Sequence, residues 1–88
     1  MPEKEIGHIT HYYGHIGVGI IQLSDTLNTG DIIHIKGHSS DFTQAVDSMQ
    51  IEHASVAQAN MGDAIGIKLN QKVHPQDKVY KVIPDVPS

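Results

Sequence analysis

The sequence predicts an all-β protein, and three observations lead to this prediction. Isoleucine and valine dominate the apolar residues, and β-branched residues are enriched in strands. Gly-Asp pairs, which are typical of turns, recur between the apolar segments. Apolar and polar residues alternate as in a half-buried strand, most clearly at Ile65, Ile67 and Leu69. We expect a small six-stranded closed β-barrel, because closure removes exposed sheet edges.

Six segments are expected to form the strands of this barrel. They are, in chain order, Gly7–Tyr13, Val18–Leu23, Asp31–Lys36, Phe42–Ile51, Ala64–Leu69 and Lys78–Ile83. In the fourth segment the apolar residues change from even to odd positions, and a β-bulge near Asp47 and Ser48 would explain this change. The segment Glu52–Asn60 has the best helix-forming composition in the chain, and we expect at most one helical turn there.

One short pattern occurs twice in the chain. Residues 28–36 and residues 60–68 share the frame Asn-x-Gly-Asp-x-Ile-x-Ile-Lys, and a weaker third copy begins at His74. We interpret the frame as a turn in which Gly30 or Gly62 takes a positive φ angle, followed by a half-buried strand. A Gly-Asp loop that binds a metal or a phosphate is the alternative, but the neighbouring residues supply no further ligands.

Length and composition favour one small domain. The chain has 88 residues, no cysteine, no arginine and a formal net charge of -4. We expect residues 6–83 to form the barrel, between a disordered N-terminus at 1–5 and a flexible tail at 84–88. A cysteine-based zinc site is excluded, and charge-driven binding to nucleic acid is disfavoured. The charged N-terminus and the short apolar runs indicate neither a signal peptide nor a membrane span, so we expect a cytoplasmic protein.

Four segments carry a resemblance to a known family. They are Leu27–Ile35, Ser48–His53, Asn60–Ile67 and Lys72–Val79. Their order and spacing resemble the second domain of the translational GTPases of the elongation factor Tu family. This resemblance implies a translation-type β-barrel and a stand-alone protein that is similar to a translation elongation factor. The chain contains no phosphate-binding loop of the Gly-x-x-x-x-Gly-Lys type, so GTP is not an expected ligand.

The resemblance also implies a site and a function. In the family, this domain helps to hold the 3′ end of aminoacyl-tRNA, and the matching positions here are Gln50, His53 and Ile67. Gln50 stands where the family usually has glutamate, so it can form hydrogen bonds without carrying a charge. The first hypothesis is a non-catalytic module that binds RNA or a translation-associated partner. The alternative is a protein-protein adaptor without RNA binding, like the C-terminal barrel of U32-type peptidases.

Catalysis and metal binding have little support in the sequence. The Ser-Asp pairs are typical of turns, the chain has no Gly-x-Ser-x-Gly motif, and its small size argues against a buried cleft. We therefore expect no enzymatic activity and no cofactor. The seven histidines are expected to be exposed strand or loop residues rather than metal ligands. Convergence of histidines from different strands is the alternative, because spacing along the chain does not reveal it.

Overall fold

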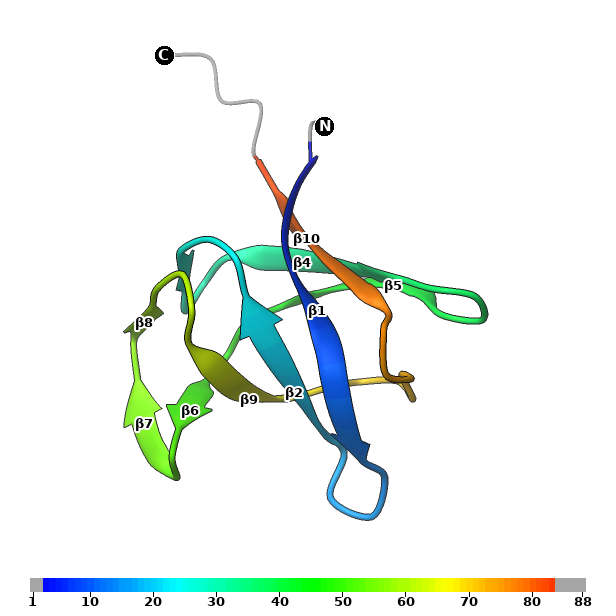
Figure 1. Ribbon diagram of the computed structural model, residues 1–88, viewed down its shortest axis with the longest axis horizontal. Helices are drawn as coiled ribbons and strands as arrows, with labels where there is room; N and C mark the ends of the chain where they lie inside the picture. The colour runs from blue at the N-terminus through cyan, green and yellow to red at the C-terminus, as the bar shows by residue number, and fades with distance from the viewer. Residues whose placement is uncertain (1–2, 84–88) are drawn as a thin grey trace.

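The computed structural model describes residues 3–83, and the prediction of an all-β protein is confirmed for this part of the chain. It contains ten strands and no helix (Figure 1). The strands are β1 (Glu3–Tyr13), β2 (Val18–Leu23), β3 (Leu27–Asn28), β4 (Ile32–Lys36), β5 (Asp41–Ala45), β6 (Met49–Ile51), β7 (Ala54–Val56), β8 (Gln58–Ala59), β9 (Ala64–Lys68) and β10 (Lys78–Val82). Within residues 3–83, no helix has the length and the apolar character that a membrane span needs.

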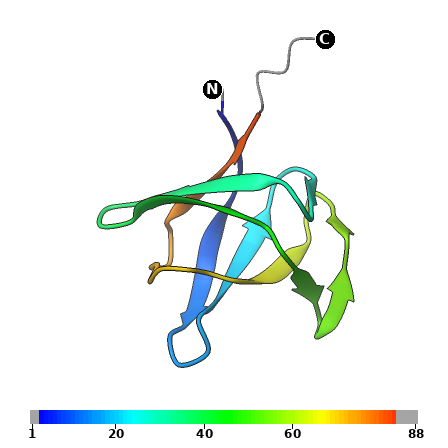
Figure 2. The same ribbon diagram turned by 180° about the vertical axis from the view of Figure 1, so that it is seen from behind.

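Eight of the strands form one antiparallel sheet, and the closed six-stranded barrel predicted from the sequence is wrong. The order in the sheet is β5-β4-β10-β1-β2-β9-β6-β7, and β3 and β8 form a separate pair. The sheet curls strongly, as the two opposite views show (Figures 1 and 2). However, the edge strands β5 and β7 do not pair with each other among the described residues. Near one edge, β6 meets β9 at a single residue pair, Gln50 and Gly66, and pairs along its length with β7.

A side chain bridges part of the opening in the sheet. Gln44 on edge strand β5 donates a hydrogen bond from Nε2 to the carbonyl oxygen of Lys68 at 3.0 Å. Its Oε1 atom accepts a hydrogen bond from the backbone N–H of Asn70 at 2.8 Å. The amide group of Gln44 therefore connects β5 to the end of β9 at a place where no backbone ladder forms.

The concave side of the curled sheet encloses the hydrophobic core. Ile33 and Ile35 of β4 and Ile65 and Ile67 of β9 are all buried, so the alternation predicted for these strands is confirmed. The core also includes these buried residues: Ile6, Ile9, Ile21, Leu23, Leu27, Phe42, Val46, Met49, Ala59, Leu69, Val73 and Val79. Since these side chains come from most of the strands, the core unites the open sheet with the β3–β8 pair.

The repeated frame forms the turn that the sequence predicts, and the weak third copy forms it as well. In each copy the aspartate Oδ2 atom accepts a hydrogen bond from the backbone N–H three residues earlier. The donor-acceptor pairs are Asn28 and Asp31 at 2.9 Å, Asn60 and Asp63 at 2.8 Å, and His74 and Asp77 at 3.0 Å. Gly30 and Gly62 both have a φ angle of 92°, and Gln76 takes the matching position with 77°. A non-glycine residue therefore adopts the left-handed conformation in the third turn.

The region between Phe42 and Asn60 differs most from the sequence-based expectation. The expected strand Phe42–Ile51 consists of two strands, β5 and β6, because Val46 leaves the sheet and exchanges backbone hydrogen bonds with the turn at Gly30 and Asp31. The register irregularities lie in β1 rather than near Asp47. The segment Glu52–Asn60, for which at most one helical turn was expected, contains β7 and β8 and no helical turn. Pairing with β6 and β3 outweighs the local helix propensity here.

The chain ends were expected to be disordered at 1–5 and flexible at 84–88. Residues 3–5 belong to β1, in which Glu3 pairs with Val82 of β10. Residues 1–2 and 84–88 lie outside the described residues.

Candidate functional site

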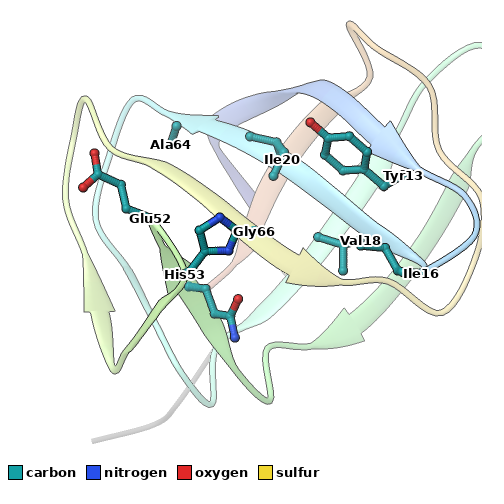
Figure 3. A pocket seen from close by; sticks show the side chains of 9 residues that line it. Tyr13, Ile16, Val18, Ile20, Glu52, His53, Ala64 and Gly66 are labelled. Carbon is teal, nitrogen blue, oxygen red and sulfur yellow. The ribbon is translucent and has the colours of Figure 1, made fainter.

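A groove of about 440 Å³ opens on the outer face of the sheet beside β9 (Figure 3). One wall comes from the β1–β2 hairpin and β2, and the opposite wall comes from β6 and the turn that follows it. The lining residues are Tyr13, Ile16, Val18, Ile20, Gln50, Glu52, His53, Ala64 and Gly66. We call this feature the β9 groove.

The first wall of the β9 groove presents apolar side chains to solvent. Tyr13 is 45% exposed and Ile16 is 57% exposed, although both are large hydrophobic residues. A tight turn holds them in place, because the carbonyl oxygen of Tyr13 accepts hydrogen bonds from the N–H groups of Ile16 and Gly17 at 3.2 and 2.9 Å. Exposed apolar side chains that gather in a hollow are typical of binding surfaces.

Gly66 forms the floor of the β9 groove. It pairs with Ile20 of β2 on one side and with Gln50 of β6 on the other. A Cβ atom at this position would lie 3.5 Å from both Ile20 Cδ1 and Val18 Cγ1, which is ordinary van der Waals contact. A larger side chain at this position would therefore occupy the space between the walls. Glycine leaves that space open.

The opposite wall depends on an unusual turn. Glu52 and His53 connect β6 to β7 as a two-residue turn, and their φ angles are 49° and 68°. Hairpin turns with two positive φ angles favour Asn-Gly or Gly-Gly, because other residues are strained there. A strained residue of this kind costs about 1–3 kcal/mol. This turn instead carries a carboxylate and an imidazole, and both side chains line the β9 groove (Figure 3).

The structure brings two of the three sequence-predicted site residues together. Gln50 and His53 both line the β9 groove. Ile67 does not line it, because it is buried in the core at 1% exposure. Its neighbour Gly66 lines the groove instead, since successive residues of a strand point to opposite faces.

The sequence-based prediction did not include the apolar wall. Tyr13, Ile16, Val18 and Ile20 precede Gln50 by some thirty residues, and only the pairing of β2 with β9 brings them beside it. One local signal existed. Gly66 replaces His34 at the equivalent position of the repeated frame, and a glycine inside a strand often marks the close approach of another molecule.

The lining of the β9 groove combines its apolar wall with four polar groups. Its polar groups are the amide of Gln50, the carboxylate of Glu52, the imidazole of His53 and the phenol of Tyr13. Neither a serine nor a cysteine, the usual covalent nucleophiles, is part of it. The described residues contain no group of three or more His, Cys, Asp or Glu side chains that could hold a metal ion.

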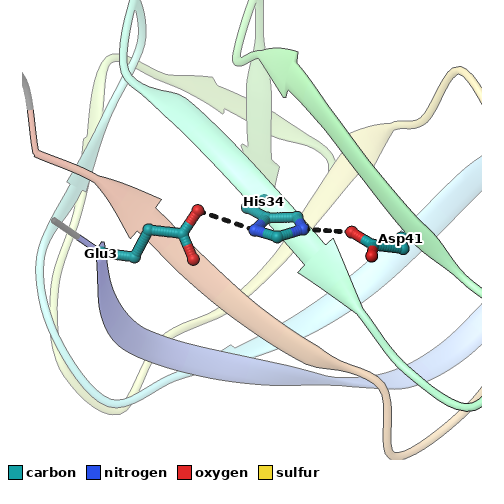
Figure 4. A network of polar contacts seen from close by, with 3 residues as sticks. All are labelled: Glu3, His34 and Asp41. Carbon is teal, nitrogen blue, oxygen red and sulfur yellow. Dashed lines mark hydrogen bonds and ion pairs between the residues drawn. The ribbon is translucent and has the colours of Figure 1, made fainter. Parts of the chain in front are cut away.

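A second polar feature lies over β4, where His34 bridges two carboxylates (Figure 4). Its Nδ1 atom lies 2.7 Å from Glu3 Oε2, and its Nε2 atom lies 2.5 Å from Asp41 Oδ1. The hydrogen bond to Asp41 raises the pKa of His34 above its ordinary value, and Glu3 adds to this effect, whereas burial opposes it. The same bond lowers the pKa of Asp41. We call these three residues the His34 clasp, and they join β1, β4 and β5.

Comparison with known sequences links the chain to proteases. No protein-family model matches it. It is 39% identical over 77 aligned residues to an uncharacterized protease of Methanocaldococcus jannaschii, and the match covers 86% of this chain and 19% of that protein. It is 32% identical over 78 residues to a collagenase of Porphyromonas gingivalis, covering 86% of this chain and 22% of the collagenase. The chain thus spans about a fifth of the length of the curated relatives it matches.

Comparison with solved structures identifies the fold. The chain superimposes on the C-terminal domain of a Geobacillus thermoleovorans protein described as a U32 peptidase, with a TM-score of 0.85 and 18% identity. The match covers 91% of this chain and 93% of that domain. A selenomethionine variant of the same domain gives a TM-score of 0.82 at 18% identity, with 86% and 96% covered.

These relatives correct the resemblance to the elongation factor Tu family. The assignment as a translation elongation factor-like protein is wrong, and neither the RNA nor the translation partner is supported. Two of the four motifs behind it are Gly-Asp turns followed by strands, and a third contains the related turn at Gln76 and Asp77. Such turns determine backbone geometry and do not identify a partner. The relatives support the alternative hypothesis and a peptidase-related setting. The chain has the fold of the C-terminal domain of a U32 peptidase.

Proposed function

We propose that this chain is a non-catalytic protein-binding module that acts together with a U32-type peptidase, and that the β9 groove is its docking site. The observation that carries the proposal is the groove itself, with an exposed apolar wall and a bare glycine floor. Complete burial of one aliphatic or aromatic side chain supplies about 1.5–3 kcal/mol. A groove of this kind therefore gives modest, reversible affinity for a partner side chain.

The relatives favour polypeptide as the ligand. They are named as a protease and as collagenases, and such enzymes act on polypeptides. Peptide cleavage uses an activated side-chain nucleophile, a metal-bound water beside a general base, or a water activated by a pair of carboxyl groups. Glu52 is the single carboxylate of the lining. The lining of the β9 groove contains neither a serine nor a cysteine. Recognition of a polypeptide, without cleavage, is the role that this lining supports.

A selection from random displayed heptapeptides tests the proposal. The immobilised chain should enrich peptides, and these should lose binding to a Gly66→Val variant, in which a branched side chain occupies the floor. We expect the variant to fold, because a Cβ atom at this position would lie no closer than 3.5 Å to its neighbours, and circular dichroism checks this. Met61→Val, at a residue that is 72% exposed and does not line the groove, is the control. Peptides that bind Gly66→Val as well as the wild type would contradict the proposal.

A further inference from the structure

The β9 groove carries a negative charge and no lysine to balance it. Glu52 is its only acidic residue, and no lysine is part of its lining. None of the ion pairs among residues 3–83 uses Glu52. None of the side-chain hydrogen bonds in this part of the chain uses Glu52, Gln50 or His53. The rim of the groove therefore offers a carboxylate that no residue between 3 and 83 neutralises.

The position of Glu52 is tightly constrained. The pairs Met49 with Val56 and Ile51 with Ala54 enclose the turn, so the hairpin register determines its conformation. Both turn residues have positive φ angles, a conformation that glycine would adopt without strain. Strained backbone occurs preferentially at functional sites. The Glu52-His53 pair thus keeps two polar side chains at the rim at a conformational cost.

Charge and apolar surface occupy different parts of the groove. Figure 3 shows Glu52 at one end, Gly66 near the middle, and Tyr13 and Ile16 toward the other end. In an extended peptide, residues i and i+2 point to the same side and lie about 6.5–7 Å apart. One side chain of such a segment can thus lie over Gly66 while the next one on that side reaches toward Glu52.

We infer that the β9 groove recognises an extended polypeptide segment in which a large apolar side chain and a lysine or arginine are two residues apart. The inference rests on the proposed function and adds the chemistry of the partner. The apolar side chain packs over Gly66 against Val18 and Ile20, and the cation pairs with Glu52. An exposed ion pair contributes about 0.2–1 kcal/mol, so the charge adjusts specificity while the apolar contact supplies most of the affinity.

Three synthetic peptides test the inference by titration into the isotope-labelled chain. They are acetyl-Gly-Leu-Ser-Lys-Gly-amide, the same peptide with glutamate in place of lysine, and the same peptide with alanine in place of leucine. The first peptide should bind most tightly. Glu52→Gln should weaken it by about two- to fivefold, and added salt should reduce the difference. Asp47→Asn, which removes an exposed carboxylate outside the groove lining, is the matched control and should leave binding unchanged.

The outcomes separate the inference from the proposed function. Equal binding of the lysine and glutamate peptides, with no effect of Glu52→Gln, would overturn the inference. The proposed function would then stand if Gly66→Val still abolished binding. Failure of all three peptides would also overturn the inference, whereas the proposed function falls only if the display selection enriches no groove-dependent peptide.

Discussion

The two copies of the repeated frame, at residues 28–36 and 60–68, have the same local structure and different outer surfaces. Both begin with a turn whose glycine has a φ angle of 92° and whose aspartate accepts the same backbone hydrogen bond. Both continue into a strand, β4 or β9, that buries two isoleucines. They differ at three positions: Thr29 against Met61 in the turn, Ile32 against Ala64 at the start of the strand, and His34 against Gly66 at the central outward position.

The difference at this central position changes what the surface can do. His34 lies between Glu3 and Asp41 and covers the outer face of β4 with the His34 clasp. Gly66 exposes the backbone of β9 and leaves the floor of the β9 groove bare. The inward residues and the turns of the frame thus determine the fold. The outward residue decides whether that part of the sheet is covered by protein or open to a partner.

The largest expected effect tests whether the two copies are equivalent inside the core. Ile33→Ala and Ile65→Ala should each lower the free energy of unfolding by about 2–5 kcal/mol, because both side chains have no exposed surface. Urea denaturation followed by circular dichroism measures both values. Ile16→Ala, at a residue that is 57% exposed, is the control and should have a small effect. A near-zero cost for either core variant would show that the copies are not equivalent.

The next effect concerns the two turns. Gly30→Ala and Gly62→Ala should each destabilise the protein by about 1–2 kcal/mol, because the left-handed conformation is unfavourable for alanine. Nothing lies within 4 Å of an added Cβ atom at either position, so the backbone alone accounts for the loss. Thermal or urea unfolding should give similar values for both. Gly14→Ala, at a glycine without a positive φ angle, is the control. Clearly different stability losses for Gly30→Ala and Gly62→Ala would show that the two turns are not equivalent.

At the third copy of the turn we expect a small gain in stability, in contrast to the losses above. Gln76 has a φ angle of 77°, so Gln76→Gly should relieve backbone strain. The gain should be at most about 1 kcal/mol, because glycine also increases the conformational entropy of the unfolded chain. An upward shift of the urea midpoint would support a common turn geometry in all three copies. A downward shift would contradict it.

The smallest effect is the pH dependence of the His34 clasp. The pKa of His34 is raised above its ordinary value of 6.5. The ion pairs of the protonated imidazole therefore contribute fully to folding stability below pH 6.5, and this contribution is lost as pH rises through the raised pKa. The pKa of Asp41 is lowered from 3.8. The ionised carboxylate therefore contributes to folding stability above pH 3.8, and this contribution is lost as pH falls through the lowered pKa. The stability difference between wild type and His34→Gln should therefore be largest between pH 3.8 and 6.5. It should decline in more alkaline buffer.

Urea unfolding of both proteins across this pH range measures the difference. In the His34→Gln background, Asp41→Asn should change the pH profile little, because the imidazole that perturbs Asp41 is absent. A difference that does not vary with pH would rule out an ionised clasp.

Local signals predicted the turns and most of the strands. The Asn-x-Gly-Asp frame predicted the turns at Gly30 and Gly62, because only a few residue types tolerate a positive φ angle. The same reasoning failed for Glu52 and His53, which adopt positive φ angles without glycine. Closure of the sheet was not predictable either, since it depends on whether β5 and β7 meet, and no local pattern encodes that contact.

The candidate site was predicted in part for a similar reason. Gln50 and His53 lie close together in the chain, and the motif containing them identified one wall of the β9 groove. Tyr13 and Ile16 form the other wall through the long-range pairing of β2 with β9. The prediction chose Ile67, whereas the adjacent residue Gly66 forms the floor of the groove. A shift of one residue along a strand moves a side chain to the other face of the sheet.

The most direct test of the account is a map of backbone amide shifts when a heptapeptide from the display selection is added to the labelled chain. We predict that the amide resonances of Gln50, His53 and Gly66 shift, while those of Thr43 and Tyr80, which flank His34 in the sheet, stay unchanged. Shifts centred on Thr43 and Tyr80 would contradict it, since the open surface would then lie over β4 and not over β9.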